Sequence, residues 1–192
     1  MASRYDDEIW QLVPAAAGAP PVHLIEFARS LAPASRVLDL GCGDGRVSVE
    51  LAAEQLTLAD VSEVALARAA ARLPDAHAIE LDPDAPLPLP DSAFDLVVCT
   101  ETIEHVRDVQ LLLSEVRRVL VPGGALALTT PAHGRRTGLT LLAKGFEARF
   151  DPLSPHLRFL TRRSLAELLD AMGFDVVALR RRAGILMAEA LR

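Results

Sequence analysis

The segment that most constrains the fold is "RVLDLGCGDGR", residues 36–46. Its first half is apolar, as in a buried strand, and its second half places Gly41, Gly43 and Gly45 at alternate positions. Glycine adopts conformations closed to other residues and lets the main chain approach a ligand closely. A strand that runs into such a loop therefore predicts a ligand-binding turn. A nucleotide phosphate, a dinucleotide and a sulfonium cofactor would all be consistent with this segment alone.

Length and composition predict one globular domain over residues 1–192. A chain of 192 residues with 51% hydrophobic residues can bury a sizeable core. No apolar run reaches the roughly 18 to 20 residues of a membrane span, and the acidic start "MASRYDDEIW" does not resemble a signal peptide. We therefore expect a soluble, cytoplasmic protein. A net charge of −6 argues against a nucleic-acid partner.

Two patterns of apolar residues alternate along the chain, one typical of strands and one typical of helices. Short blocks bounded by Gly, Pro or Asp are typical of strands buried on both faces. They lie at 36–40, 56–60, 76–81, 94–99 and 125–130. Helical patterns lie at 22–31, 45–55, 62–73, 108–120 and 162–174. This alternation predicts a parallel sheet with helices on both sides.

The last third and the helix ends give further local signals. Two strands fit residues 174–181 and 184–191, and the short joint around Gly184 makes them antiparallel. Ser62, Asp108 and Thr161 are the predicted N-caps of three helices. The proline-rich segment 81–92 is predicted to be a loop.

The spacing of the glycines reduces the number of ligand classes that fit the loop. A Walker loop requires Gly-Lys-Ser/Thr, which the chain lacks, and a dinucleotide loop has the spacing GxGxxG, whereas this loop reads GxGxG. Asp60 does not discriminate, because an acid about 20 residues after the first glycine binds ribose hydroxyls in either case.

Two later segments and the glycine loop together resemble a known protein family. "LPLPDSAFDLVVCTETIEHV" (87–106) and "LSEVRRVLVPGGALALTTP" (113–131), together with "VLDLGCGDGR", resemble the signature segments of class I S-adenosylmethionine-dependent methyltransferases. The similarity is greatest to the small-molecule branch around the ubiquinone and menaquinone biosynthetic enzymes. It covers residues 35–131, and 156–176 more loosely. It implies an α/β fold, a Rossmann-like three-layer α/β/α arrangement with a mostly parallel seven-stranded sheet whose last strand is antiparallel, and S-adenosylmethionine as the cofactor.

The resemblance also implies which residues bind the cofactor. Asp39 would reach its amino end and Asp60 its ribose. Asp82 would contact the adenine, and Asp84 is the alternative candidate for that contact. The other implied contacts are Gly41, Cys42, Gly43, Gly45, Val61, Thr100 and Glu101, with Leu81 or Leu87 as an apolar wall and Tyr5 or Trp10 as a shield.

Methyl transfer is an in-line displacement, so a base is needed only if the acceptor must lose a proton. His105, His133 and His156 are the candidate bases, and a structural role is the competing interpretation for each. Cys42 and Cys99 lack a CxxC spacing, so we infer no metal site and no disulfide.

Two segments are expected to surround the site. Residues 1–33 form an N-terminal helical cap, and residues 132–158 form an insertion on the acceptor side that is predicted to act as a lid. Its apolar face suggests a moderately hydrophobic acceptor or a homodimer contact; this face comprises Leu139, Leu141, Leu142 and Phe146.

The sequence thus predicts a methyltransferase that acts on a small molecule, with oxygen as the favoured acceptor atom. Two alternatives stay open. One is a nitrogen or carbon methyltransferase on the same scaffold. The other is a non-catalytic module that binds S-adenosylmethionine or S-adenosylhomocysteine, since a fold does not by itself decide function.

Overall fold

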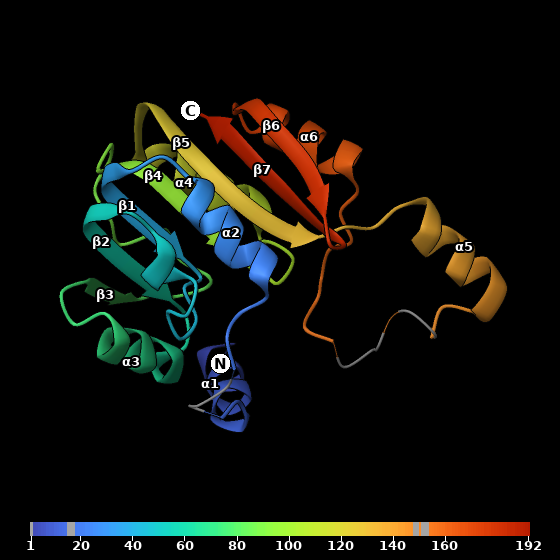
Figure 1. The fold of residues 1–192 in the computed structure, drawn as a ribbon, viewed down its shortest axis with the longest axis horizontal. Helices are drawn as coiled ribbons and strands as arrows, with labels where there is room; N and C mark the ends of the chain where they lie inside the picture. The colour runs from blue at the N-terminus through green and yellow to red at the C-terminus, as the bar shows by residue number, and fades with distance from the viewer. Residues whose placement is uncertain (1, 15–17, 148–149, 151–153) are drawn as a thin grey trace.

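The computed structural model describes residues 2–14, 18–147, 150 and 154–192. Its centre is a sheet in the order β3-β2-β1-β4-β5-β7-β6, seven strands among the described residues (Figure 1). The strands are β1 (Ala34–Leu40), β2 (Ala53–Asp60), β3 (His77–Glu80), β4 (Phe94–Thr100), β5 (Leu120–Pro131), β6 (Asp175–Arg182) and β7 (Ile185–Leu191).

Strand direction confirms the predicted fold class. Strands β1 to β5 pair in parallel, whereas β7 is antiparallel to both of its neighbours, β5 and β6. The reversal follows from the turn at Ala183 and Gly184, both with positive φ, which leaves no room for a crossover helix. All seven strand segments predicted from the sequence are present, with boundaries moved by a few residues.

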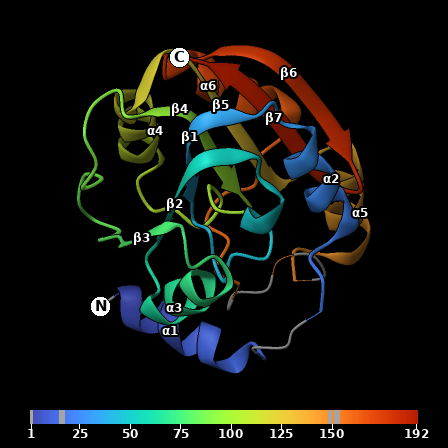
Figure 2. The same cartoon turned by 60° about the vertical axis from the view of Figure 1, so that its left-hand side comes forward.

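Helices cover both faces of the sheet (Figure 2). The helices of the described residues are α1 (Ala2–Leu12), α2 (Val22–Ser30), α3 (Glu63–Arg72), α4 (Val109–Val119), α5 (Arg135–Lys144) and α6 (Arg162–Ala171), with a short 3-10 helix, η1 (Ser48–Glu50). Alternate residues of β4 show the two layers. Val97 and Cys99 pack with α4 and α6, whereas Leu96 and Val98 pack with Phe27 of α2.

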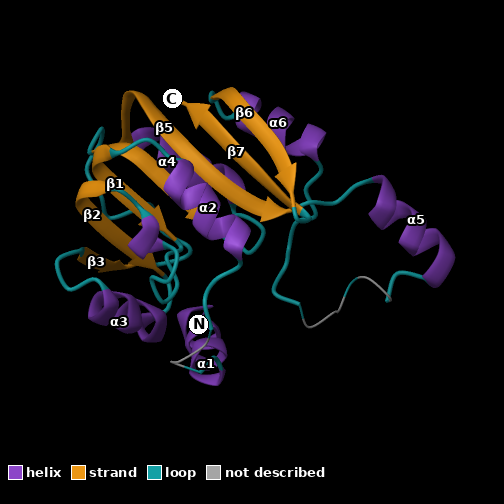
Figure 3. Cartoon of the chain, viewed as in Figure 1, coloured by secondary structure: helices purple, strands orange, loops and turns teal. Residues whose placement is uncertain are grey.

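The predicted caps are present where the sequence placed them. Ser62 accepts a hydrogen bond from the backbone N–H of Ala65, and Asp108 accepts one from Leu111. Thr161 caps α6 in the same way, and Gly173 follows that helix with φ +78°. Residues 81–93 form turns without helix or strand, as expected for the proline-rich loop (Figure 3).

The helix predicted over residues 45–55 is wrong. This region holds η1, and β2 already begins at Ala53. Strand pairing overrides the local apolar pattern, because Ala53 and Gln55 are paired with Ala34 and Arg36 of β1. The twelve residues from Gly41 to Ala52 must hold both the glycine loop and the crossover, which leaves no length for a regular helix.

The outermost helices lie on different parts of the molecule. Helix α1 packs against α3, whereas α5 stands apart from the sheet beyond the end of β5 (Figure 1). Its Leu139 and Leu142 are 68% and 88% exposed. No helix in the described part of the chain has the length and apolarity required to cross a bilayer.

Candidate active site

A cavity of about 380 Å³ lies at the carboxyl ends of β1, β2 and β4. Parallel strands bring their carboxyl ends to one edge of the sheet, which is where open α/β sheets bind ligands. Residues from α1, the glycine loop, the end of β2, the 81–87 loop, the loop after β4 and the start of α4 form its wall. Of the residues proposed from the sequence, those on the wall are Gly41, Gly43, Asp60, Val61, Leu81, Asp82, Leu87, Glu101, His105 and Trp10.

Asp60 connects β2 to the glycine loop. Its Oδ2 accepts a hydrogen bond of 2.8 Å from the backbone N–H of Gly43, and its Oδ1 accepts one of 2.9 Å from Ser62. The residue is 7% exposed, and burial raises the pKa of its carboxyl. Each carboxylate oxygen can accept more than one hydrogen bond, so Asp60 can also accept from a ligand in the cavity.

Two glycines are required by close contacts. Gly41 and Gly43 have φ angles of +76° and +54°. A Cβ atom at Gly43 would lie 2.8 Å from the Trp10 ring, and one at Gly41 would lie within van der Waals overlap of the Thr102 side chain. Gly45 has a similar conformation and packs against Ala69 of α3, so it shapes the turn rather than the cavity wall.

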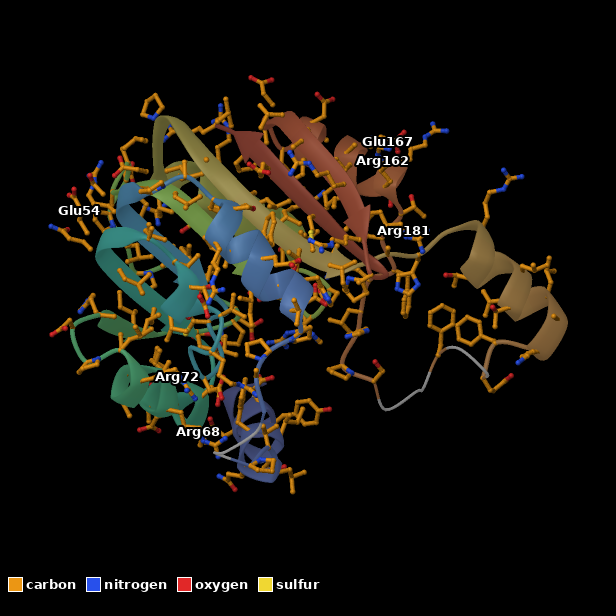
Figure 4. The ribbon with its side chains drawn as sticks, viewed as in Figure 1. Glu54, Arg68, Arg72, Arg162, Glu167 and Arg181 are labelled. Atoms are coloured by element: carbon orange, nitrogen blue, oxygen red, sulfur yellow. The ribbon has the colours of Figure 1, made fainter. Side chains whose placement is uncertain are left out.

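Helix α1 is attached to the rest of the site by polar contacts. Asp7 Oδ1 accepts hydrogen bonds from Ser62 Oγ at 2.6 Å and from the Val64 backbone at 3.2 Å. Arg68 of α3 donates to the carbonyl of Val13, which follows α1 (Figure 4). These contacts place Trp10 over the glycine loop, whereas Tyr5, the other predicted shield, is 50% exposed and outside the cavity wall.

Asp39 and Cys42 lie behind the wall rather than on it. Asp39 Oδ2 accepts a hydrogen bond of 2.6 Å from Ser48 Oγ, whereas its buried Oδ1 has no partner among the described residues. Burial is the main cause that raises the pKa of Asp39 to about 6. Burial also raises the pKa of the Cys42 thiol, whose Sγ lies 3.5 Å from the Gly43 carbonyl, so Cys42 is an inert packing group.

The two acidic residues that are candidates for contact with the adenine lie in different environments. Asp82 is on the cavity wall and accepts a hydrogen bond from the backbone of Asp84. Asp84 is not on the wall and pairs with Arg107 at 2.6 Å. The geometry thus favours Asp82 as the acid that faces a ligand.

Glu101 is held in an unusual conformation directly after β4. Its φ is +51°, and its Oε1 accepts a hydrogen bond of 2.8 Å from Thr129 Oγ1. Burial raises the pKa of Glu101 to about 7. Non-glycine residues with positive φ are concentrated at functional sites. Thr100, the last residue of β4, is not on the cavity wall, and its carbonyl accepts a hydrogen bond from Thr102 Oγ1.

The three candidate histidines do not form one site. His105 is on the cavity wall, and the His156 ring lies beside it with a centroid distance of 4.8 Å. His133 lies elsewhere, edge-on to Phe159 and near Phe150. Burial lowers the pKa of His105 and of His156, and His105 lowers the pKa of His156 further.

The insertion contributes little to this cavity. Within the described part of residues 132–158, Pro155 alone is on the wall. Helix α5 contributes no wall residue and lies beyond the end of β5 (Figure 1). Part of the predicted insertion, residues 148–149 and 151–153, lies outside the described residues. Its role as a lid stays a prediction.

Sequence reasoning missed several residues of the wall. Asp6 and Ile9 come from α1, and Thr102, Val106 and Arg107 come from the loop after β4. Asp6 had a signal in the acidic "YDDE" run, and residues 1–33 were predicted to form a cap, but the sequence did not indicate which side chains of α1 would face the cavity.

A mostly parallel sheet with one reversed strand, a glycine loop after β1 and an acid at the end of β2 define the fold of class I S-adenosylmethionine-dependent methyltransferases. The chain belongs to this family: the model described as "Methyltransferase domain" matches residues 15–179. S-adenosylmethionine is the cofactor that this membership implies.

Individual proteins are similar to the chain. A protein of Mycolicibacterium smegmatis described as a "probable S-adenosylmethionine-dependent methyltransferase" is 36% identical over 148 residues, which cover 73% of this chain and 52% of that protein. A malonyl-[acyl-carrier protein] O-methyltransferase of Pseudescherichia vulneris is 36% identical over 141 residues, which cover 72% and 54%. The chain therefore spans about half the length of these relatives.

Among solved structures, an S-adenosylmethionine-dependent methyltransferase of Mesorhizobium loti superposes with a TM-score of 0.66. The match covers 93% of this chain and all of that one, at 22% identity. This likeness supports the fold. The quinone-pathway branch suggested by the sequence stays a prediction.

Proposed function

We propose that this protein transfers a methyl group from S-adenosylmethionine to a small-molecule acceptor, with oxygen as the acceptor atom. The observation that carries the proposal is that one cavity joins the glycine loop and Asp60 to Glu101 and His105. The first pair would bind the cofactor, and the second pair would face the acceptor.

The residues present fit the cofactor. Asp39 Oδ1, which is buried without a partner in the part of the chain that the structure describes, is an acceptor close behind the glycine loop and suits a cationic amino group. Asp60 offers further acceptor capacity to ribose hydroxyls, and Leu81 and Leu87 give an apolar surface near Asp82 for the adenine. When bound, S-adenosylmethionine supplies a methyl group already activated by the positive sulfonium.

The chain's own task is then alignment and exclusion of water. Trp10 and Ile9 of α1 cover the cavity from one side, and Pro155 borders it on another. The preference for oxygen is supported by the relative from Pseudescherichia vulneris, which is described as a malonyl-[acyl-carrier protein] O-methyltransferase. His105, His133 and His156 remain the candidate bases, and the contact of His105 with the cavity favours it over His133.

Calorimetric titration with S-adenosylmethionine, S-adenosylhomocysteine and NADH is the first test. We expect micromolar binding of the first two and none of NADH. The second test is formation of S-adenosylhomocysteine with a panel of hydroxyl, carboxyl, amine and carbon acceptors. Product with an oxygen acceptor supports the proposal. Cofactor binding without product from any acceptor would instead indicate the binding-module alternative.

A further inference from the structure

One carboxylate and two imidazoles meet beside the cavity. Glu104 and His105 belong to the loop after β4, and His156 belongs to the segment that precedes α6. One potential ligand atom from each of these residues lies within 4.8 Å of the others. Two hydrogen bonds hold the segments together: the Leu157 backbone N–H donates to the Glu104 carbonyl at 2.8 Å, and the Arg158 guanidinium donates to the Arg107 carbonyl at 2.6 Å.

Glu104 has an oxygen that the described chain does not use. The residue is 1% exposed, and its Oε2 accepts a hydrogen bond of 3.0 Å from Thr130 Oγ1. Its Oε1 is buried without a hydrogen-bond partner among the described residues and lies 3.9 Å from His105 Nε2. Leaving a buried carboxylate oxygen unsatisfied is costly, so such an atom calls for an explanation such as an ion.

His105 is oriented for ligation. Its Nδ1 lies 3.3 Å from the carbonyl oxygen of Pro155. A carbonyl can only accept, so Nδ1 carries the proton and Nε2 keeps a lone pair directed to the Glu104 side. Proteins orient metal-binding imidazoles in this way, with the other ring nitrogen bonded to a carbonyl or carboxylate. The Thr130 contact orients the Glu104 carboxylate equivalently.

We propose that Glu104, His105 and His156 bind a divalent transition-metal ion such as Zn²⁺. Two imidazoles and one carboxylate are a donor set that such ions take at sites with open coordination positions. Ligand atoms about 2.0–2.2 Å from a metal lie no more than about 4.4 Å apart. The observed separations therefore require inward shifts of well under about 1 Å, within reach of side-chain rotation.

The position of the site indicates what an open coordination position would face. His105 and Pro155 are on the cavity wall, so a further ligand would come from the cavity. Under the proposed function, on which this step rests, that ligand is the acceptor oxygen. A hydroxyl bound to a divalent ion ionises more readily and can release its proton to water, so the metal would take the place of His105 and His156 as bases, since both would then be ligands.

Calorimetry on the full chain after chelator treatment tests the site, with ZnCl₂ in one titration and MgCl₂ in another. We expect one Zn²⁺ per chain and much weaker Mg²⁺ binding, because Mg²⁺ prefers oxygen ligands. Glu104→Gln, which keeps the side-chain shape, and His156→Ala should each weaken Zn²⁺ binding at least tenfold. The matched control is His77→Ala, at an exposed histidine of β3, which should bind Zn²⁺ as the parent does.

Three results would overturn the site: no saturable Zn²⁺ binding, equal affinity for Mg²⁺, or parent-like Zn²⁺ affinity in both Glu104→Gln and His156→Ala. Titration of the same proteins with S-adenosylmethionine separates this proposal from the proposed function. Retained cofactor affinity in a variant that has lost Zn²⁺ supports the site and shows that the variant is folded. Cofactor binding by a parent chain that does not bind Zn²⁺ would reject the metal site alone.

Discussion

The Oδ2 atom of Asp60 lies 2.8 Å from the backbone nitrogen of Gly43. This hydrogen bond joins the end of β2 to the middle of the glycine loop. The other carboxylate oxygen accepts from the backbone N–H of Ser62, the N-cap of α3. The acid that we propose to bind ribose is therefore positioned by the same loop that we propose to carry the cofactor.

Asp60→Asn tests that relationship. The amide keeps the shape of the side chain but removes the charge, and one of its two polar atoms can no longer accept from an N–H. We expect the binding free energy of S-adenosylmethionine to weaken by roughly 1.5–3 kcal/mol, the scale of a charged hydrogen bond. Calorimetry measures this change, with Asp75→Asn at an exposed turn as the control. Unchanged affinity would refute the ribose assignment.

Gly43→Ala should disturb both the loop and α1. The added Cβ would lie 2.8 Å from Trp10 at a φ of +54°, which combines steric overlap with backbone strain of the order of 1 kcal/mol. We expect a lower free energy of unfolding in urea and weaker cofactor binding. Adding Trp10→Ala should recover part of the lost stability, because it removes the overlap but not the strain. Strictly additive effects of the two substitutions would contradict this packing.

Asp82→Ala and Asp84→Ala should separate the two adenine candidates. Asp82 is on the cavity wall, whereas Asp84 pairs with exposed Arg107, and exposed ion pairs contribute little. We expect Asp82→Ala to weaken S-adenosylmethionine binding about tenfold or more, and Asp84→Ala to change it less than threefold, at a scale of about 1.4 kcal/mol per tenfold. The reverse order in calorimetry would assign the adenine contact to Asp84.

The raised pKa of Asp39 predicts that the free energy of unfolding depends on pH. Burial raises its pKa in the folded chain to about 6, above the value of about 3.9 expected in the unfolded chain. Between these values the folded state holds more protons, so the contribution of Asp39 to the free energy of unfolding falls as pH rises from 4 to 6. Urea unfolding at pH 4.5 and 7 should therefore show the parent losing stability relative to Asp39→Asn as pH rises. A constant difference between the two proteins would contradict the raised pKa.

Leu142→Glu examines the exposed face of α5. Leu142 is 88% exposed, so the substitution should change the free energy of unfolding by no more than about 0.5 kcal/mol. Light scattering on the same variant tests the predicted homodimer: a parent dimer that becomes monomeric in Leu142→Glu would place the contact on α5. A parent that is monomeric at all concentrations would reject the homodimer prediction.

Most of the fold could be predicted because its signals are local. In the sequence, buried parallel strands are short runs of apolar residues. The caps at Ser62, Asp108 and Thr161 depend on neighbouring residues along the chain. The error at 45–55 has the opposite origin: a helix-like apolar pattern gave way to the pairing of Ala53 with Ala34, a contact between separate strands.

By itself the sequence determined the sheet, its reversed last strand and the glycine loop with Asp60, because strand burial, turn chemistry and glycine spacing are properties of contiguous residues. The tertiary structure alone decided that Trp10 lies on Gly43, that Asp82 rather than Asp84 faces the cavity, and that His156 joins His105 while His133 does not. Those relationships depend on how segments far apart in the chain pack together. The spacing of residues along a sequence does not specify which side chains of a distant segment will contact them.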